Sequence, residues 1–205
     1  MAMNDQARAV FDFWFQPGPG QPADAPRPEW FKKDDAFDRQ IAGRFGALIE
    51  QALAGGLLEW DADGPASQLA RILVLDQFTR NVHRGTPLAF AGDALALEAA
   101  RRMVDSGKHL ALSPLQRAFV YLPFEHAEEM AMQEQAVALY TRMENDERDS
   151  ASAATAKGIA GMLDYALRHR EVIGRFCRFP HRNAILGRAS TAEEEAYLRQ
   201  PGSGF

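Results

Sequence analysis

The high alanine content of this chain limits its fold more than any other feature of the sequence. Alanine far outnumbers valine and isoleucine combined, and alanine has the highest helix propensity, whereas branched residues favour strands. Apolar residues also recur at helical spacing, as in Phe37, Ile41, Phe45 and Leu48. This spacing is typical of a helix with one buried face. The sequence therefore predicts an all-α fold.

Capping residues, prolines and glycines divide the chain into predicted helices. A serine or threonine followed three residues later by glutamate or glutamine caps a helix start, and Ser113 with Gln116, and Ser190 with Glu193, form two such pairs. Pro123 is expected to kink or divide its helix, because an internal proline removes a backbone hydrogen bond. The start and stop signals place helices over residues 5–15, 34–54, 65–83, 86–106, 113–123, 124–144, 149–176 and 190–199.

Most connections between these helices are short, apart from a proline- and glycine-rich loop over residues 16–34. Short connections favour antiparallel neighbours, so the expected architecture is a set of stacked antiparallel helical hairpins. No internal repeat indicates a regular solenoid. At 205 residues the chain can bury a sufficient core without disulfide bonds. We expect a single domain over residues 1–205, ending in an irregular tail at 200–205.

Charge and composition disfavour several classes of function. The net charge of -5 argues against a nucleic-acid partner, which requires a basic surface. No apolar run reaches the length of a membrane span, and the first sixteen residues lack the regions of an export signal. Cys177 is the only cysteine, so an internal disulfide is excluded, and we expect this side chain to be buried. The sequence predicts a cytoplasmic protein without a cofactor.

The first of three polar segments covers residues 71–85. Gln77, Arg80, Asn81 and Arg84 stand at helical spacing and are expected to share one face. Asp76 lies four residues before Arg80, so the two can form an ion pair. Arginine suits a carboxylate or phosphate ligand, which asparagine and glutamine can orient. The alternative is a solvated helix face with an internal ion pair.

The second polar segment follows Pro123. His126, Glu129 and Gln133 are expected to share one helix face, with Glu125 and Glu128 beside it. A neighbouring carboxylate would raise the pKa of His126, and the two groups could act as acid and base. His126 and Glu129 also match half of a di-metal carboxylate motif, but the second half is missing. A metal site is therefore not expected, and a structural histidine is the alternative.

The third polar segment covers residues 168–188, where arginines and histidines give a local excess of positive charge. Arg182, between His181 and Asn183, could hold an anion together with backbone N–H groups. His169 lies near the start of the same segment. The alternative is that these arginines neutralise acidic residues of a neighbouring helix, such as 193–195.

Three long strings and the last residues of the chain carry a family resemblance. They are VLDQFTRNVHRGTPLAFAGDALAL, YLPFEHAEEMAMQEQAVALY, GRFCRFPHRNAILGRAS and PGSGF. In length and order they resemble an uncharacterised bacterial family, domain of unknown function 924, and the resemblance extends from Val10 over nearly the whole chain. It implies an all-helical fold similar to tetratricopeptide-repeat proteins, without their sequence repeat, and it implies no particular activity.

The resemblance also implies a set of functional positions. Cys177 stands where the family more often has glycine, and Thr79 stands where it often has proline. The polar residues typical of the family match Asp76, Gln77, Arg80, Asn81, Arg84, Glu125, His126, His169, His181, Arg182 and Asn183. Together with Glu129, these are the candidate ligand-binding residues.

The leading functional hypothesis is a protein that binds a small anionic ligand or a peptide carboxylate in a polar cavity shared by the three segments. Arg80, Arg84 and Arg182 would bind the anion, because helical hairpin proteins commonly present concave surfaces. An enzyme is the first alternative, in which His126 is a general acid or base oriented by Glu125 or Asp76. The second alternative is a scaffold that binds another protein.

Overall fold

The predicted all-α class is confirmed by the computed structural model, which describes residues 3–17, 26–30, 32–149 and 151–204. None of these residues forms a strand. The α-helices are α1 (Asp5–Phe15), α2 (Asp35–Leu53), α3 (Pro65–Leu73), α4 (Thr79–Val82), α5 (Asp93–Asp105), α6 (Pro114–Glu125), α7 (Met130–Glu147), α8 (Ala153–Phe176) and α9 (Ala192–Leu198). Short 3-10 turns are η1 (Pro28–Trp30), η2 (Leu58–Asp61), η4 (Pro87–Phe90), η5 (Lys108–Ala111) and η6 (Pro180–Arg182), and η3 (Val74–Phe78) is a π-helical turn.

Side-chain caps explain where several helices begin. Asn4, Asp34 and Ser152 accept hydrogen bonds from backbone N–H groups in the first turns of α1, α2 and α8, which have no partner within the helix. The predicted capping box at Ser113 is present at the start of α6. The second predicted box is shifted by one residue, because it is Thr191 whose hydroxyl caps α9.

Several predicted helix boundaries are corrected by the structure. The helix expected over 124–144 is α7 (Met130–Glu147), and the helix expected over 149–176 begins only at Ala153. The helix expected over 86–106 begins only at Asp93, because the hydroxyl of Thr86 donates to the carbonyl of His83 at 2.8 Å and does not cap a helix. Pro123 does not divide its helix. It lies inside α6, which continues to Glu125 before the chain breaks.

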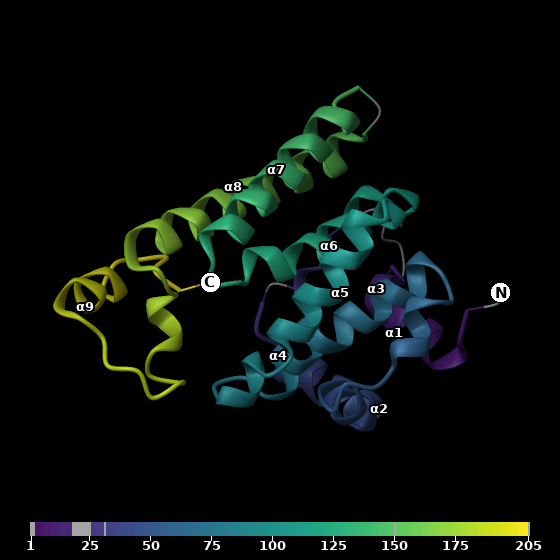
Figure 1. The fold of residues 1–205 in the computed structure, drawn as a ribbon, viewed down its shortest axis with the longest axis horizontal. Coiled ribbons are helices and arrows are strands. Elements are labelled where there is room, and N and C mark those ends of the chain that lie inside the picture. The colour runs from purple at the N-terminus through teal and green to yellow at the C-terminus, as the bar shows by residue number, and fades with distance from the viewer. Residues whose placement is uncertain (1–2, 18–25, 31, 150, 205) are drawn as a thin grey trace.

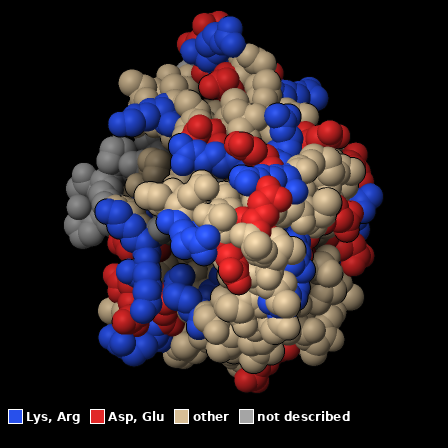
Figure 2. Space-filling model, turned by 90° about the vertical axis from the view of Figure 1, so that its left-hand side faces the viewer, with Lys and Arg blue, Asp and Glu red and all other residues tan. Residues whose placement is uncertain are grey.

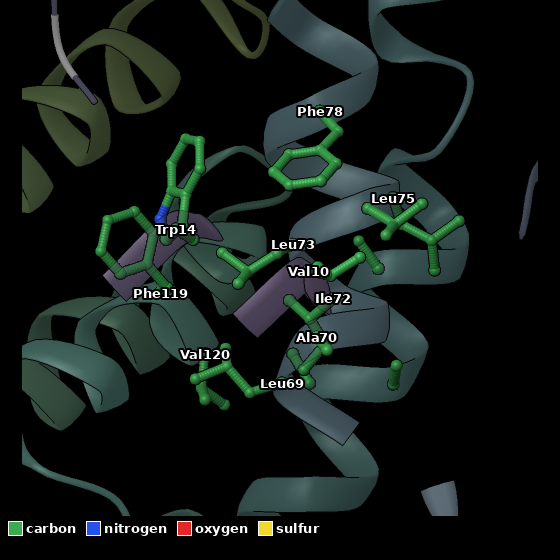
Figure 3. Close-up of a cluster of buried hydrophobic side chains, with 14 of the residues drawn as sticks. Val10, Trp14, Leu69, Ala70, Ile72, Leu73, Leu75, Phe78, Phe119 and Val120 are labelled. Atoms are coloured by element: carbon green, nitrogen blue, oxygen red, sulfur yellow. The ribbon is translucent and has the colours of Figure 1, made fainter. Parts of the chain in front are cut away.

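The main hydrophobic core forms where α1, α3 and α6 meet (Figure 3). Val10 and Trp14 of α1 are fully buried, as are Leu69 and Leu73 of α3. Phe119 of α6 packs edge-on against Trp14, with ring centroids 5.6 Å apart. Burying each such side chain contributes about 1.5–3 kcal/mol, so apolar burial by residues far apart in the sequence accounts for the mutual position of these helices.

The last third of the chain adds an antiparallel hairpin to this core. Figure 1 shows α7 and α8 side by side, with α9 at the end of the molecule away from the N-terminus. No helix in the described ranges is long and apolar enough to cross a membrane. Parts of the predicted loop over 16–34 and of the tail over 200–205, namely 18–25, 31 and 205, lie outside the described residues.

A π-helical turn between α3 and α4 positions the polar residues of the first segment. The backbone N–H of Thr79 bonds to the carbonyl of Val74, five residues earlier, and the Thr79 hydroxyl donates to the same oxygen at 2.9 Å. A Cβ at Gly92 would overlap the carbonyl oxygen of Leu75. Glycine at this position therefore lets the start of α5 approach the π-helical turn, which places Asp93 beside the polar residues of η3 and α4. Such turns are frequent at functional sites.

Candidate functional site

Asp76 lies at the centre of a buried polar cluster formed by η3, α4, α5, α6 and η6. Its side chain is 1% exposed. It accepts hydrogen bonds from Nδ1 of His126 at 2.7 Å, from Nη2 of Arg80 at 3.3 Å and from the amide of Gln77. Burial opposes ionisation of this carboxyl, but His126 and the positive charge of Arg80 outweigh it and lower the pKa of Asp76 well below its ordinary value.

His126 follows the last residue of α6, and Asp76 holds it through one ring nitrogen, Nδ1. Because an ionised carboxylate can only accept, Nδ1 of His126 carries the hydrogen. Nε2 makes no hydrogen bond to the described part of the chain, and the side chain is 17% exposed. Burial and then the charge of Arg80 lower the pKa of His126 to about 4, although Asp76 opposes this change.

The net direction expected for the pKa of His126 was therefore wrong, because burial and the charge of Arg80 outweigh the rise that the carboxylate of Asp76 does cause. The sequence places carboxylates near this residue, but it does not indicate that the ring is buried or that a guanidinium from another helix lies close to it. Near pH 7, His126 is neutral and Nε2 carries a lone pair. The ring can accept a proton at Nε2 while Nδ1 stays bonded to Asp76.

Two arginines from distant segments meet on the carboxylate of Asp93. Arg80 Nη2 lies 2.8 Å from Oδ1 of Asp93, and Arg182 Nη1 lies 3.2 Å from Oδ2. Arg182 also donates to the carbonyl of His126 at 3.0 Å. Both guanidinium groups lie over the ring of Phe90, at 5.4 and 4.7 Å from its centroid. The first and third polar segments are thus joined here.

The two arginines have unused hydrogen-bond donors. Nε of Arg80 and Nε of Arg182 are buried and make no hydrogen bond within the described residues. Burial and then the nearby charge of Arg80 lower the pKa of Arg182 to about 10, so both groups remain cationic near pH 7. Since arginine presents its donors as a planar fork, these nitrogens could bind an additional acceptor.

A second histidine–carboxylate pair adjoins the first. Nδ1 of His169 lies 3.0 Å from Oε1 of Glu125 and 2.9 Å from the carbonyl of Tyr165. The rings of His169 and His126 have centroids 6.3 Å apart. His181 on η6 packs against the ring of Phe179, and burial together with the charge of Arg182 lowers its pKa to about 3. The cluster therefore includes residues of all three predicted segments.

The side chains of four candidate residues make no hydrogen bond or ion pair with the described residues of the cluster around Asp76: three bind other side chains, and Glu129 is exposed. Asn81 donates to Asp38 at 2.7 Å, and Arg84 forms an ion pair with the same carboxylate at 3.1 Å. The shared face predicted for Gln77, Arg80, Asn81 and Arg84 does not form, because α4 ends at Val82 and Arg84 lies beyond it. Glu129 is exposed at the start of α7. Asn183 donates to the hydroxyl of Ser190 at 3.0 Å.

The face predicted beyond Pro123 is also replaced by a different arrangement. Gln133 does not line up with His126, because the chain breaks between α6 and α7. Its amide nitrogen donates to the backbone carbonyls of Phe124, Glu125 and Ala127. These bonds satisfy carbonyl groups at the end of α6, so Gln133 fixes the break that places His126.

Other basic residues of the third segment pair with acids on α9. Arg175 lies 2.8 Å from Glu193, and Arg178 lies 2.6 Å from Glu194. Figure 2 shows basic and acidic side chains interleaved over the end of the molecule that carries α9. Cys177 was expected to be buried, but it is exposed. It follows the last residue of α8 with a φ of 56°, in the left-handed conformation that commonly ends a helix.

Three acidic residues complete these contacts, although sequence reasoning did not include them among the candidates. Asp93 bridges Arg80 and Arg182, and Asp38 binds Asn81 and Arg84, as described above. Glu128 accepts from Arg188 at 2.6 and 2.9 Å and from the N–H of Phe179 at 2.8 Å. In the sequence, Asp38 and Asp93 have only the ordinary signal of acids in a first helical turn.

The described side chains contain no group of three potential ligands that could hold a metal ion. Two surface cavities, of about 530 and 410 Å³, both border α1. The larger lies against α2 and the smaller against the start of α6. Neither is lined by residues of the polar cluster. Neither of these two cavities is therefore the polar cavity expected between the three segments.

Comparison with known proteins identifies the family. The sequence matches the family described as "Bacterial protein of unknown function (DUF924)" over residues 10–202. The chain belongs to this family. It is also similar to a solved structure, the protein of unknown function ATU0120 from Agrobacterium tumefaciens, with 38% sequence identity, a TM-score of 0.77, and coverage of 94% of this chain and 96% of that chain. No curated protein matches.

The DUF924 resemblance predicted from the sequence strings is thus confirmed. In this DUF924 protein, the cluster around Asp76 combines a neutral imidazole with two guanidinium groups from different parts of the chain. The imidazole can accept a proton at Nε2, and the guanidinium groups can stabilise negative charge nearby. Proton transfer and anion binding are the two kinds of chemistry that this arrangement can support.

Proposed function

We propose that the protein is an enzyme in which His126 acts as a general base, with Asp76 as the residue that orients it. The observation that carries this proposal is the 2.7 Å hydrogen bond between His126 Nδ1 and a buried carboxylate, which leaves Nε2 of His126 without a hydrogen bond to the described residues. The reaction class is ester hydrolysis or transfer: Nε2 takes a proton from water or from a substrate hydroxyl, and that oxygen attacks the acyl or phosphoryl atom of the ester. The ester bond breaks, and the departing alcohol takes the proton back from His126.

The electrostatics of the cluster keep His126 in the form that can act as a base. Burial and then the charge of Arg80 lower the pKa of His126 to about 4, so the ring is neutral near pH 7 and Nε2 can accept a proton. Asp76 would stabilise the imidazolium formed when Nε2 accepts the proton.

Binding of a small anion or peptide carboxylate without chemistry is a second candidate function. It is supported by the unused Nε donors of Arg80 and Arg182. Both functions use the same arginines, and they differ in whether His126 is required. A test must therefore examine His126 independently of ligand affinity.

Diethyl pyrocarbonate tests the state of His126, because it acylates a neutral imidazole nitrogen that solvent can reach. At pH 7 we expect mass spectrometry to find His126 modified in the folded protein, and buried His109 unmodified. The Asp76→Asn variant should alter the rate at His126, since the amide no longer fixes the ring tautomer. Protection of His126 in the folded wild type would contradict the proposal.

A panel of small carboxylic and phosphoric esters then tests turnover. We expect His126→Gln to lower the rate of any hydrolysed ester by about 10²–10⁴-fold, the usual contribution of a general base. His83→Gln is the matched control, because His83 lies on the turn after α4 and outside the cluster. Equal rates for the His126→Gln variant and the wild type would show that the base lies elsewhere.

A further inference from the structure

We infer that Asp93 occupies the position of a substrate carboxylate, and that a small carboxylic acid binds between Arg80 and Arg182 by displacing it. This inference names the substrate class and rests on the proposed function of His126. Asp93 is held through both of its carboxylate oxygens by two guanidinium groups. A substrate carboxylate would make the same two contacts.

The two arginines require an anion between them. The positive charges of Arg80 and Arg182 repel each other. Water screens this repulsion little, because the side chain of Arg182 is only 7% exposed. Both groups pack on Phe90, which fixes their planes and excludes water from one side. A carboxylate matches the planar fork of an arginine better than a spherical anion does. The geometry therefore favours a carboxylate over chloride.

Asp93 is the acid of the cluster whose side chain a ligand can displace from the two arginines. Its side chain is 22% exposed and it makes no other hydrogen bond or ion pair within the described residues. Asp76, in contrast, is 1% exposed and is bonded to three side chains. Asp93 is also the first residue of α5, where a carboxylate turned towards solvent is still stabilised by the helix N-terminus.

The charge balance of the cluster favours a ligand that replaces Asp93 over an anion that binds in addition to it. Among the side chains that form ion pairs with Arg80 and Arg182, Asp76 and Asp93 carry two negative charges against the two positive charges of the arginines. A further anion would leave an uncompensated negative charge in a buried site, which is costly. A monocarboxylate that replaces Asp93 keeps the balance, whereas a phosphate dianion does not.

The position of the bound carboxylate relative to His126 follows from shared contacts. Arg80 binds both Asp93 and Asp76, and Asp76 holds the imidazole. Arg182 binds Asp93 and the backbone carbonyl of His126. A carboxylate at this position is linked to the imidazole through Arg80 and Asp76, and to the backbone of His126 through Arg182 alone. The substrate class is thus a small carboxylic acid whose reacting hydroxyl or attacking water lies near Nε2 of His126.

Acetate provides the test, because it can replace the deleted side chain of an Asp93→Ala variant. We expect sodium acetate to raise the Tm of this variant by several degrees more than sodium chloride at the same ionic strength. In the wild type, acetate must compete with Asp93, so its apparent Kd should be at least about tenfold higher than in Asp93→Ala. The reason is that acetate can bind only when Asp93 has moved away from the arginines, and this state is rarely populated. Asp105→Ala, at the exposed end of the same helix, is the matched control and should respond equally to both salts.

Three results would overturn the inference. The first is an equal response of Asp93→Ala to acetate and chloride, and the second is persistence of the acetate effect when Arg182→Gln is added. The third is stronger stabilisation by phosphate than by acetate, which would exclude carboxylates as the preferred class. If Asp93→Ala does not fold, Asp93→Asn retains the shape without the charge, and its acetate affinity measured by calorimetry should exceed that of the wild type.

These outcomes are distinguishable from failure of the proposed function. Acetate binding is measured without turnover, and diethyl pyrocarbonate reports on His126 without a ligand. If acetate stabilises Asp93→Ala but diethyl pyrocarbonate does not modify His126, the protein binds carboxylates without using His126 as a base. If His126 is modified but acetate does not stabilise Asp93→Ala, His126 is a base whose substrate is not a carboxylic acid.

Discussion

The buried imidazole of His126 makes the stability of the folded protein depend on pH. Burial lowers the pKa of His126 to about 4 in the folded state, whereas in the unfolded chain it has its ordinary value of about 6.5. Between these two pH values the unfolded state binds one more proton than the folded state, so stability is lost as the pH falls. Above pH 6.5 both states are neutral at this residue and the effect vanishes.

The magnitude follows from the two pKa values. They differ by about 2.5, and each pH unit corresponds to about 1.4 kcal/mol for one proton. His126 should therefore reduce the free energy of unfolding by about 3 kcal/mol between pH 6.5 and pH 4. This is a large part of the total stability of an ordinary domain, about 5–15 kcal/mol.

Urea unfolding followed by circular dichroism at pH 5.0, 5.5, 6.0, 6.5 and 7.5 measures this slope. The comparison of wild type with His126→Gln isolates the contribution of His126, since other titrating groups are common to both proteins. Asp76 stays ionised throughout this range in the folded state, because its pKa is held well below its ordinary value. His83→Gln should leave the wild-type slope unchanged.

The expected result is a stability difference between wild type and His126→Gln that shrinks by about 1.4 kcal/mol for each unit of pH below 6.5. A difference that stays constant from pH 7.5 to pH 5.0 would refute the reasoning. It would mean that His126 titrates in the same way in the folded and unfolded states, and that the ring is not desolvated.

Three further predictions concern the fold, each checked by urea unfolding at pH 7. Gly92→Ala should destabilise by about 1–3 kcal/mol or more, because the new methyl group overlaps the carbonyl oxygen of Leu75; an unchanged midpoint would mean that α5 can shift freely. Cys177→Gly should stabilise by roughly 1 kcal/mol, since glycine adopts the observed positive φ without strain, and a destabilised variant would contradict this. Thr191→Ala should remove the hydroxyl that accepts from the N–H of Glu194 and lower the free energy of unfolding by about 1 kcal/mol. Backbone hydrogen exchange should become faster in α9 only. Exchange in α9 as slow as in the wild type would show that this cap is dispensable.

Features set by neighbouring residues could be predicted from the sequence. The bounds of α1 and the cap of α2 followed from spacing and capping chemistry, because a helix is formed by hydrogen bonds between residues four apart. The ion pair of Asp76 with Arg80 was predicted for the same reason. The predicted helix over residues 65–83 was right in extent, but its π-helical turn carried no signal that spacing could reveal.

The candidate site was predicted only in part, since its composition depends on contacts between distant segments. His126, Arg80 and Arg182 were identified as candidates, whereas Asp93 was not, because an acid in a first helical turn is ordinary. Asn81 and Arg84 were assigned to the same site, but both bind Asp38 of α2. Helical spacing gives the direction of a side chain from its own axis and does not give the neighbouring helix that it meets.

The sequence by itself determined the helical class, most helix starts and the family, since each depends on residues close together in the chain. The tertiary structure alone decided that His126 is buried beside Arg80, that its pKa is lowered, and that Asp93 joins two arginines 102 residues apart in the sequence numbering (Arg80 to Arg182). The physical reason is that desolvation and charge pairing act through space and fall off over a few ångströms. Their effect on a residue is therefore set by what folds against it.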